Sequence, residues 1–264
     1  MRMQHFGIKL AGVTLLALLV CPLIILIGVS LNPGAEQLFP PTGLSLRWYF
    51  NLANRQGFID AAELTLLLAA WSTLSSVIIA TLSGIAIVRY DFFGRDAVLT
   101  LLLSPLIIPQ VVTGMAFLVT LSALGIFSSL LSLAVVHLVI TLPFATRIVV
   151  AALTGASITL EEAARSLGAP PVKAFLLVTL PLARSGIITA GVFAFVTSFE
   201  NFTASQFLVW DRTTLPVELY TYVQTENDPT AAAVSSLIVL VVVAFVTAFN
   251  GFISRHLFSS EGRQ

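Results

Sequence analysis

The polar side chains in this apolar sequence gather in two places, and their types indicate binding rather than covalent chemistry. One is the charged stretch Glu161–Gly168, and the other is the neighbourhood of Glu200. The GxxxxGK[ST] phosphate loop, a GxSxG nucleophile turn and an HExxH metal pair are all missing from the sequence. The chain therefore lacks the motifs that many enzymes use to hydrolyse a nucleotide, an ester or a peptide bond.

The composition predicts an integral membrane protein. Of the 264 residues, 57% are hydrophobic and 10% are charged, whereas soluble domains carry about 25% charged residues. The formal net charge is zero, which gives no reason to expect nucleic acid as a partner. The single cysteine, Cys21, excludes an intrachain disulfide, and the scattered histidines form no ligand cluster. We therefore expect no metal and no cofactor on this chain.

Six segments are long and apolar enough to cross a bilayer as helices, which needs about 20 residues each. The first follows Arg2 and Lys9 and is interpreted as a retained signal anchor. Together the segments predict an all-α membrane protein with a single transmembrane domain over residues 1–264. The expected spans are approximately 10–31, 61–88, 97–121, 129–150, 186–209 and 231–253.

Several local signals refine these spans. Asp60 and Glu63 have the spacing of a capping box at the start of the second span. Small polar residues on one face of that span predict close helix packing; they are Thr65, Ser72, Ser76 and Ser83. Prolines interrupt the third and fourth spans, and they fit either kinked packing helices or hinges beside a pathway; they are Pro105, Pro109 and Pro143.

The distribution of Lys and Arg predicts the orientation. With the N-terminus in the cytoplasm, ten of the 13 basic residues lie in inner segments and three, Arg47, Arg55 and Arg212, lie in outer loops. The positive-inside rule then places both termini and the loop 156–185 in the cytoplasm.

The loop 156–185 has the signals of two short helices. Thr159 and Glu162 have capping-box spacing, Gly168 can end a helix in the left-handed conformation, and Pro170 and Pro171 suit the first turn of a second helix. We expect that second helix to stop before Pro181.

This loop resembles a known family. The pattern E-A-A-x3-G-x9-[IV]-x-L-P fits without a gap, with Glu162 at its start and Pro181 at its end. It is similar to the cytoplasmic loop of permease subunits of bacterial binding-protein-dependent ABC importers. Further stretches resemble the polyamine-type (spermidine/putrescine) branch of that family; they are FPPTGLSLRWY (39–49), LLSPLIIPQVVTGMAF (102–117), HLVITLPFATR (137–147) and TLPVELY (214–220).

The resemblance implies a type I importer permease fold, with a coupling helix–turn–helix between spans four and five. It also implies the bacterial inner membrane, a second identical or paralogous permease subunit, and a periplasmic or lipid-anchored substrate-binding protein. Two ATPase subunits would bind ATP and magnesium and dock on the loop. The implied docking residues are Glu161, Glu162, Ala163, Ala164, Arg165, Leu167 and Gly168.

The second polar group is predicted to lie on the substrate pathway. Glu200 falls near the middle of the fifth expected span, where an ionised carboxylate should face protein or a water-filled cavity. Ser198, Asn201 and Ser205 make a polar stripe beside it, and Gln110 and Thr113 form a similar polar step in the third span. A path for a cation or amine and a structural hydrogen bond between helices both fit this pattern. His137 is interpreted as a packed, neutral residue.

The polyamine-type branch often has paired aspartates where this chain has Glu200 and Asn201, a difference that bears on the substrate. The expected function is nevertheless a non-catalytic permease subunit of an ATP-driven importer for a small cationic or amine solute. The rival is an ion-coupled secondary transporter without an ATPase partner. That rival usually needs an internal repeat and ion-coordinating groups at broken helices.

Overall fold

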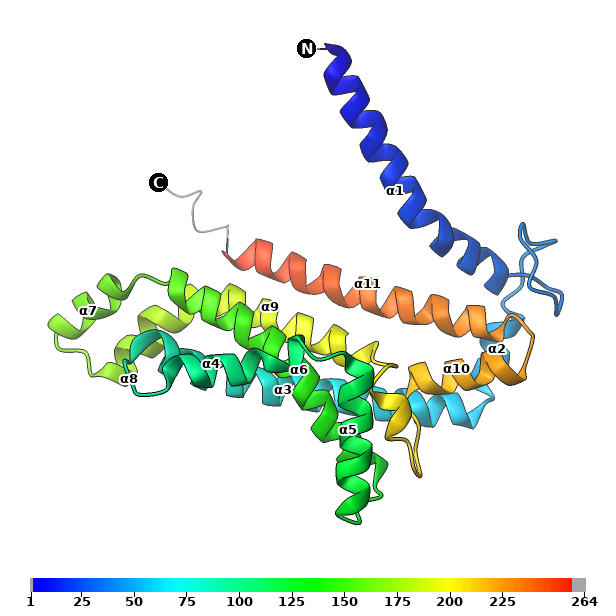
Figure 1. The fold of residues 1–264 in the computed structure, drawn as a ribbon. Coiled ribbons are helices and arrows are strands. Elements are labelled where there is room, and N and C mark those ends of the chain that lie inside the picture. The colour runs from blue at the N-terminus through cyan, green and yellow to red at the C-terminus, as the bar shows by residue number, and fades with distance from the viewer. Residues whose placement is uncertain (1, 258–264) are drawn as a thin grey trace. The chain divides into compact units, whose positions relative to one another are not determined.

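A computed structural model describes residues 2–257, and every regular element in that range is helical. This confirms the all-α prediction. The α-helices, labelled in Figure 1, are α1 (Arg2–Ser30), α2 (Arg47–Ala53), α3 (Gln56–Arg89), α4 (Arg95–Leu103), α5 (Gln110–Ala123), α6 (Ser129–Gly155), α7 (Ile158–Ser166), α8 (Pro171–Ala174), α9 (Leu180–Phe199), α10 (Leu215–Thr225) and α11 (Thr230–Leu257). Shorter turns are the 3₁₀ helices η1 (Ser104–Leu106) and η3 (Ser205–Phe207) and the π-helix η2 (Phe175–Thr179).

The chain divides into two compact units. The first comprises the chain up to Ile59 with Glu218–Phe245, and the second comprises Asp60–Val217 with the chain from Val246 onward. Each unit is described separately below, and the predicted functional residues all lie in the second.

Among the described residues, five helices are long and apolar enough to cross a membrane, or six if one bent pair counts as a span. They are Ala11–Ser30, Gln56–Arg89, Ser129–Gly155, Pro171–Phe199 and Thr230–Phe249, with the bent pair Arg95–Leu106 and Gln110–Ala123. Large apolar side chains remain exposed along them, for example Leu16 and Leu82 at 64% each. Such surfaces suit contact with lipid.

The third expected span is broken rather than continuous. Its two helical parts meet at an angle of 100°, and Figure 1 shows α5 turning away from α4. Pro105 is the second residue of η1, and Pro109 lies immediately before α5 in extended conformation (φ −55°, ψ 133°). Proline removes a helical hydrogen bond and disfavours helix in the residue before it, so two prolines four residues apart end one helix and start another. Pro143, by contrast, lies inside α6, which continues through it.

The fifth expected span, 186–209, is wrong at both ends. The helical stretch there is Pro171–Phe199, because α8, η2 and α9 follow one another without a break. The second half of the expected span leaves the helix at Glu200 and contains only the short turn η3. The expectation that the second loop helix stops before Pro181 is therefore also wrong. The π-helical turn, whose wider hydrogen-bond pattern joins Leu180 N–H to the carbonyl of Phe175, lies where the proline disturbs a regular helix.

The core of the second unit is built on α6. Toward one end, α6 packs Leu133, Val136 and Ile140 against Leu64 and Leu68 of α3. Toward the other, Val149 and Leu153 pack with small residues of α3 and α9, namely Ala80, Ala183 and Ala190. Figure 1 shows α9 running along α6.

Small residues let these helices approach closely. A Cβ added to Gly186 on α9 would lie 2.2 Å from the Cβ of Ala152 on α6. The polar face predicted on α3 also faces the interior. Thr65, Ser72 and Ser76 are buried, and the hydroxyls of Ser76 and Thr141 hydrogen-bond at 2.7 Å.

In the first unit, hydrogen bonds connect α2 to the loop after α1 and to the start of α11. The indole N–H of Trp48 donates to the carbonyl of Asn32 at 2.7 Å, and the Asn51 amide donates to the hydroxyl of Thr230 at 2.9 Å.

Helix α3 begins at Gln56, so Asp60 lies inside it and the predicted capping box at Asp60 and Glu63 is wrong.

Candidate functional site

The predicted docking loop folds as a helix, a tight turn and a second helix. Helix α7 ends at Ser166, and Gly168 has the left-handed φ of +94°. The N–H of Gly168 donates to the carbonyl of Arg165 at 2.9 Å, and that of Ala169 donates to Ala164 at 3.1 Å. This pair of bonds is the Schellman motif, in which a glycine reverses the chain and satisfies the last helical carbonyls. The left-handed helix end predicted at Gly168 is confirmed.

The start of α7 differs from the prediction. The helix begins at Ile158 after Ser157, and Ser157 forms no side-chain capping bond. Thr159 therefore lies in the first helical turn instead of before it, and the predicted capping box of Thr159 and Glu162 is wrong. Pro171 does start α8, with Pro170 in extended conformation before it, as expected for proline at a first turn.

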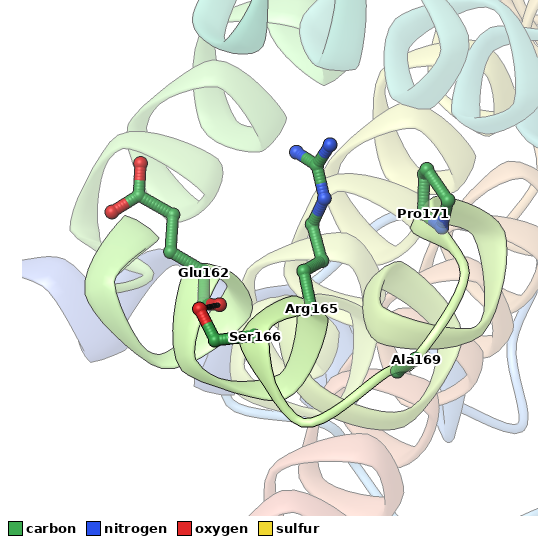
Figure 2. A pocket seen from close by; sticks show the side chains of 5 residues that line it. All are labelled: Glu162, Arg165, Ser166, Ala169 and Pro171. Atoms are coloured by element: carbon green, nitrogen blue, oxygen red, sulfur yellow. Dashed lines mark hydrogen bonds between the residues drawn. The ribbon is translucent and has the colours of Figure 1, made fainter.

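The turn presents an exposed, mostly apolar edge. Leu167 is 90% exposed and Val172 is 71% exposed, although a folded chain normally buries such side chains. Glu162, Ala163 and Arg165 are exposed as well. Beside this edge lies a hollow of about 480 Å³ lined by Glu162, Arg165, Ser166, Ala169 and Pro171. Figure 2 shows the Glu162 and Arg165 side chains extending away from the backbone of α7.

Glu161 behaves differently from the other predicted docking residues. Its Oε2 atom lies 3.4 Å from Nε of Arg89 at the end of α3, and the two side chains are only 15% and 10% exposed. The hydroxyl of Thr179, the last residue of η2, donates to the same oxygen. The guanidinium of Arg89 also donates to the carbonyl of Ala156, at 3.2 Å. Glu161 is thus turned into the chain and makes intrachain contacts.

The second group of predicted residues forms a buried polar cluster around His137 of α6. One ring nitrogen of His137 hydrogen-bonds Ser198 at 2.7 Å, and the other bonds Ser205 at 3.0 Å. The side-chain oxygen of Asn201 accepts from the Ser205 hydroxyl at 3.0 Å, and its amide nitrogen donates to Gln110 at 2.8 Å. The cluster joins α5, α6, the end of α9 and η3.

The sequence predicts Ser198 and Asn201 on one span and Gln110 on another, all beside the substrate pathway, and the structure brings these three residues into one cluster. His137 was foreseen as packed, and it is 1% exposed, but its place at the centre of the cluster was missed. Its ring could have been matched to the polar residues near 200 only if the pairing of α6 with α9 had been known. Thr113 is buried apart from the cluster, its hydroxyl 3.5 Å from the carbonyl of Pro109.

Glu200 does not lie in mid-helix. It is the residue that ends α9, and its side chain is exposed. The helix ends there because Asn201 turns the chain and accepts the backbone N–H groups of Ala204 and Ser205 at 3.2 and 3.3 Å. Because its carboxylate is exposed, Glu200 does not need a partner to offset the cost of a buried charge. Within the described residues, no group of three His, Cys, Asp or Glu side chains could hold a metal ion.

The fold and the loop together define a class of protein, a helical membrane subunit with a projecting helix–turn–helix. Residues 76–259 match the family described as the binding-protein-dependent transport system inner membrane component. Because this match covers more than half of the sequence, the chain belongs to that family. It is an inner-membrane permease subunit of an ABC importer.

Individual relatives agree with this assignment. The chain is 29% identical over 233 residues to the spermidine/putrescine transport system permease protein PotC of Escherichia coli strain K12, covering 88% of each. It is 33% identical over 195 residues to a probable molybdenum ABC transporter permease protein of Haloferax volcanii, covering 70% of this chain and 71% of that one. A chain of a bacterial alginate ABC transporter, solved in complex with its alginate pentasaccharide-bound periplasmic protein, has the same fold. Its TM-score is 0.70 at 19% identity, over 97% of this chain and 96% of that one.

Proposed function

We propose that this chain forms half of the translocation pathway of a polyamine importer and that it carries no catalytic activity of its own. The observation that carries the ATPase part of the proposal is the turn at Gly168, where a Schellman motif holds Leu167 90% exposed beside the hollow at Glu162 and Arg165. An apolar side chain presented on a rigid turn suits burial against a partner. The partner would be an ATPase subunit, which would bind ATP and magnesium itself.

Two copies of that ATPase would dock on two permease subunits, this one and an identical or paralogous second subunit. A substrate-binding protein would deliver the solute from the other side. ATP binding would draw the two ATPase subunits together, move the docking helices and turn the pathway outward; hydrolysis would reset it. In this scheme the chain is a two-state element whose balance the nucleotide shifts.

The substrate class rests on the relatives. The PotC relative spans 88% of the chain and is named for spermidine and putrescine, so we propose a polyamine or another small amine. The molybdenum-named relative covers a smaller share, 70%, and makes an oxyanion the natural competitor in any test. Amines and oxyanions have opposite charge, so one experiment separates them.

The test is reconstitution of this chain with an ATPase subunit, a second permease subunit and a binding protein from the same organism. We expect the ATPase subunits to purify with the chain and ATP-dependent uptake of labelled spermidine or putrescine to follow. Uptake of molybdate without polyamine uptake would replace the substrate but keep the importer. Uptake driven by an ion gradient without any ATPase would overturn the proposal.

The orientation is part of the proposal. The excess of ten basic residues over three supports cytoplasmic termini and a cytoplasmic docking loop. Cysteines introduced at Ser45 and Arg212 should react with an impermeant thiol reagent in intact spheroplasts, and one at Lys173 should react only after the membrane is opened. Cys21 is exposed and would first be replaced by serine. Labelling of Lys173→Cys in intact spheroplasts would reverse the orientation.

A further inference from the structure

The contacts of Glu161 set it apart from the rest of the docking loop. Glu161 lies in the first turn of α7, but its carboxylate does not face outward with Glu162. Both members of its ion pair are largely covered, with Arg89 10% and Glu161 15% exposed. A half-buried ion pair is screened less by solvent than a surface pair, so it responds more strongly when one partner is removed.

The three residues that meet at this carboxylate come from three different elements. Arg89 is the last residue of α3, Glu161 belongs to α7, and Thr179 closes η2 immediately before α9. Arg89 adds a hydrogen bond to the carbonyl of Ala156, in the link between α6 and α7. One carboxylate oxygen therefore connects the docking helix to the end of one candidate membrane span, Gln56–Arg89, and to Thr179 within another, Pro171–Phe199.

The position of Thr179 makes this contact suited to transmitting movement of α7 to α9. A π-helical turn is an uncommon, higher-energy variant that often marks functional sites. Thr179 is 1% exposed, and its hydroxyl donates to Glu161 at the point where η2 becomes α9. A movement of α7 would therefore pull on the junction at which the hydrogen-bond pattern changes. Regular α-helix on either side would resist such a change more strongly.

We infer that Arg89, Glu161 and Thr179 form a coupling joint, with Glu161 a positioning residue that transmits movement of the docking helix to α3 and α9. This inference rests on the proposed function, because it assumes an ATPase on the docking loop. It differs from docking itself: loss of the joint leaves the ATPase bound but separates hydrolysis from transport.

The experiment uses the complete reconstituted transporter and measures solute taken up per ATP hydrolysed, together with the amount of ATPase subunit retained. Glu161→Gln keeps the size of the side chain and removes the charge that pairs with Arg89. Thr179→Val keeps the shape and removes the hydroxyl donor. Asp91→Asn is the matched control, because Asp91 pairs with Arg95 at 3.0 Å in an i,i+4 ion pair and is 98% exposed. Exposed pairs of this kind contribute little.

We expect Glu161→Gln and Thr179→Val to retain the ATPase and to lower uptake per ATP by roughly fivefold or more, the lower range of measured coupling between sites. Asp91→Asn should match the wild type in both measurements. Because each ratio is taken per assembled complex, a lower yield of one variant does not affect the reading. Uptake per ATP equal to wild type in both variants would overturn the inference.

Two further outcomes separate the inference from the proposed function. If Glu161→Gln instead releases the ATPase, as substitution of the exposed Glu162 is expected to do, Glu161 is a docking residue and the joint is refuted. If the wild-type chain itself retains no ATPase, the proposed function fails before the joint is tested. A double-mutant cycle with Arg89→Gln completes the test, because the two substitutions should be strongly non-additive if both act through one ion pair.

Discussion

Replacement of Gly168 by alanine isolates the contribution of one backbone conformation to docking. Gly168 has φ +94°, which residues with a side chain rarely adopt, and no atom lies within 4 Å of an added Cβ. The methyl group therefore meets no neighbour, and the whole effect comes from the left-handed backbone. That conformation costs a residue other than glycine roughly 1–2 kcal/mol.

In the absence of the ATPase subunit, the loop can relieve this strain by opening the turn. Binding of the ATPase subunit requires the closed turn, and the strain then returns. The full 1–2 kcal/mol is then an upper limit on the loss of binding energy, which corresponds to about 5- to 30-fold weaker retention of the ATPase subunit. The assay is the affinity of the purified ATPase for the permease in nanodiscs, measured with wild-type and variant chains under the same salt conditions.

The chain contains a closely matched control for this strain. Gly125, after α5, has φ +71°, also has nothing within 4 Å of an added Cβ, and closes its own Schellman motif through Gly125 N–H to Ser122 and Ile126 N–H to Leu121. Gly125→Ala should lower the thermal stability of the chain about as much as Gly168→Ala does, without weakening the binding of the ATPase subunit. Equal affinity for Gly168→Ala and wild type, or an equal loss in both variants, would refute the reasoning.

Three further predictions concern packing and polarity in the second unit. Gly186→Ala should destabilise the chain by about 1–3 kcal/mol, because the added Cβ would lie 2.2 Å from the Cβ of Ala152. Gly191→Ala is the control and should not destabilise it, because the atom nearest to its added Cβ is 3.6 Å away. Thermal unfolding of both variants in detergent is the measurement. Asn201→Ala should cost about 1–3 kcal/mol for each buried partner left without a hydrogen bond. Asn201→Asp should also destabilise the chain in the same unfolding assay, because a carboxylate keeps the acceptor oxygen but cannot donate to Gln110, and it places a charge at a buried position. Glu200→Gln should assemble and unfold like wild type because Glu200 is exposed, and uptake per complex then reports whether its charge attracts the solute; a loss of yield would instead restore a structural role.

The parts of the fold that were predictable from sequence are those set by local chemistry. Apolar length places the long helices, and the left-handed tendency of glycine places the turn at Gly168. The prolines at 105 and 109 were recognised as disturbances, but the 100° bend between the two helical parts depends on packing against α6 and η3. Proline alone permits such a break without setting its angle.

The errors have a common physical origin. Capping-box spacing at Asp60 and at Thr159 predicts that a helix starts at each residue, yet both helices begin earlier. The pattern [ST/D]-x-x-E also occurs inside helices, where tertiary packing rather than the cap decides the boundary. The fifth span was placed by hydropathy alone, and hydropathy does not register that Asn201 ends α9 by accepting two backbone N–H groups.

The corrected end of α9 changes how the two predicted sites relate to function. Glu161 was assigned to the partner and faces the chain, whereas Glu200 was assigned to the interior and is exposed. Both predictions differ from the structure for the same reason. The environment of a carboxylate depends on where its helix ends and on which basic side chain lies beside it, and local sequence shows neither. Arg89 is supplied to Glu161 by α3, some 70 residues earlier in the sequence, and the break at Asn201 leaves Glu200 at an exposed helix end. The charge of Glu161 is thus held by its ion pair with Arg89, while the carboxylate of Glu200 is exposed at the end of α9.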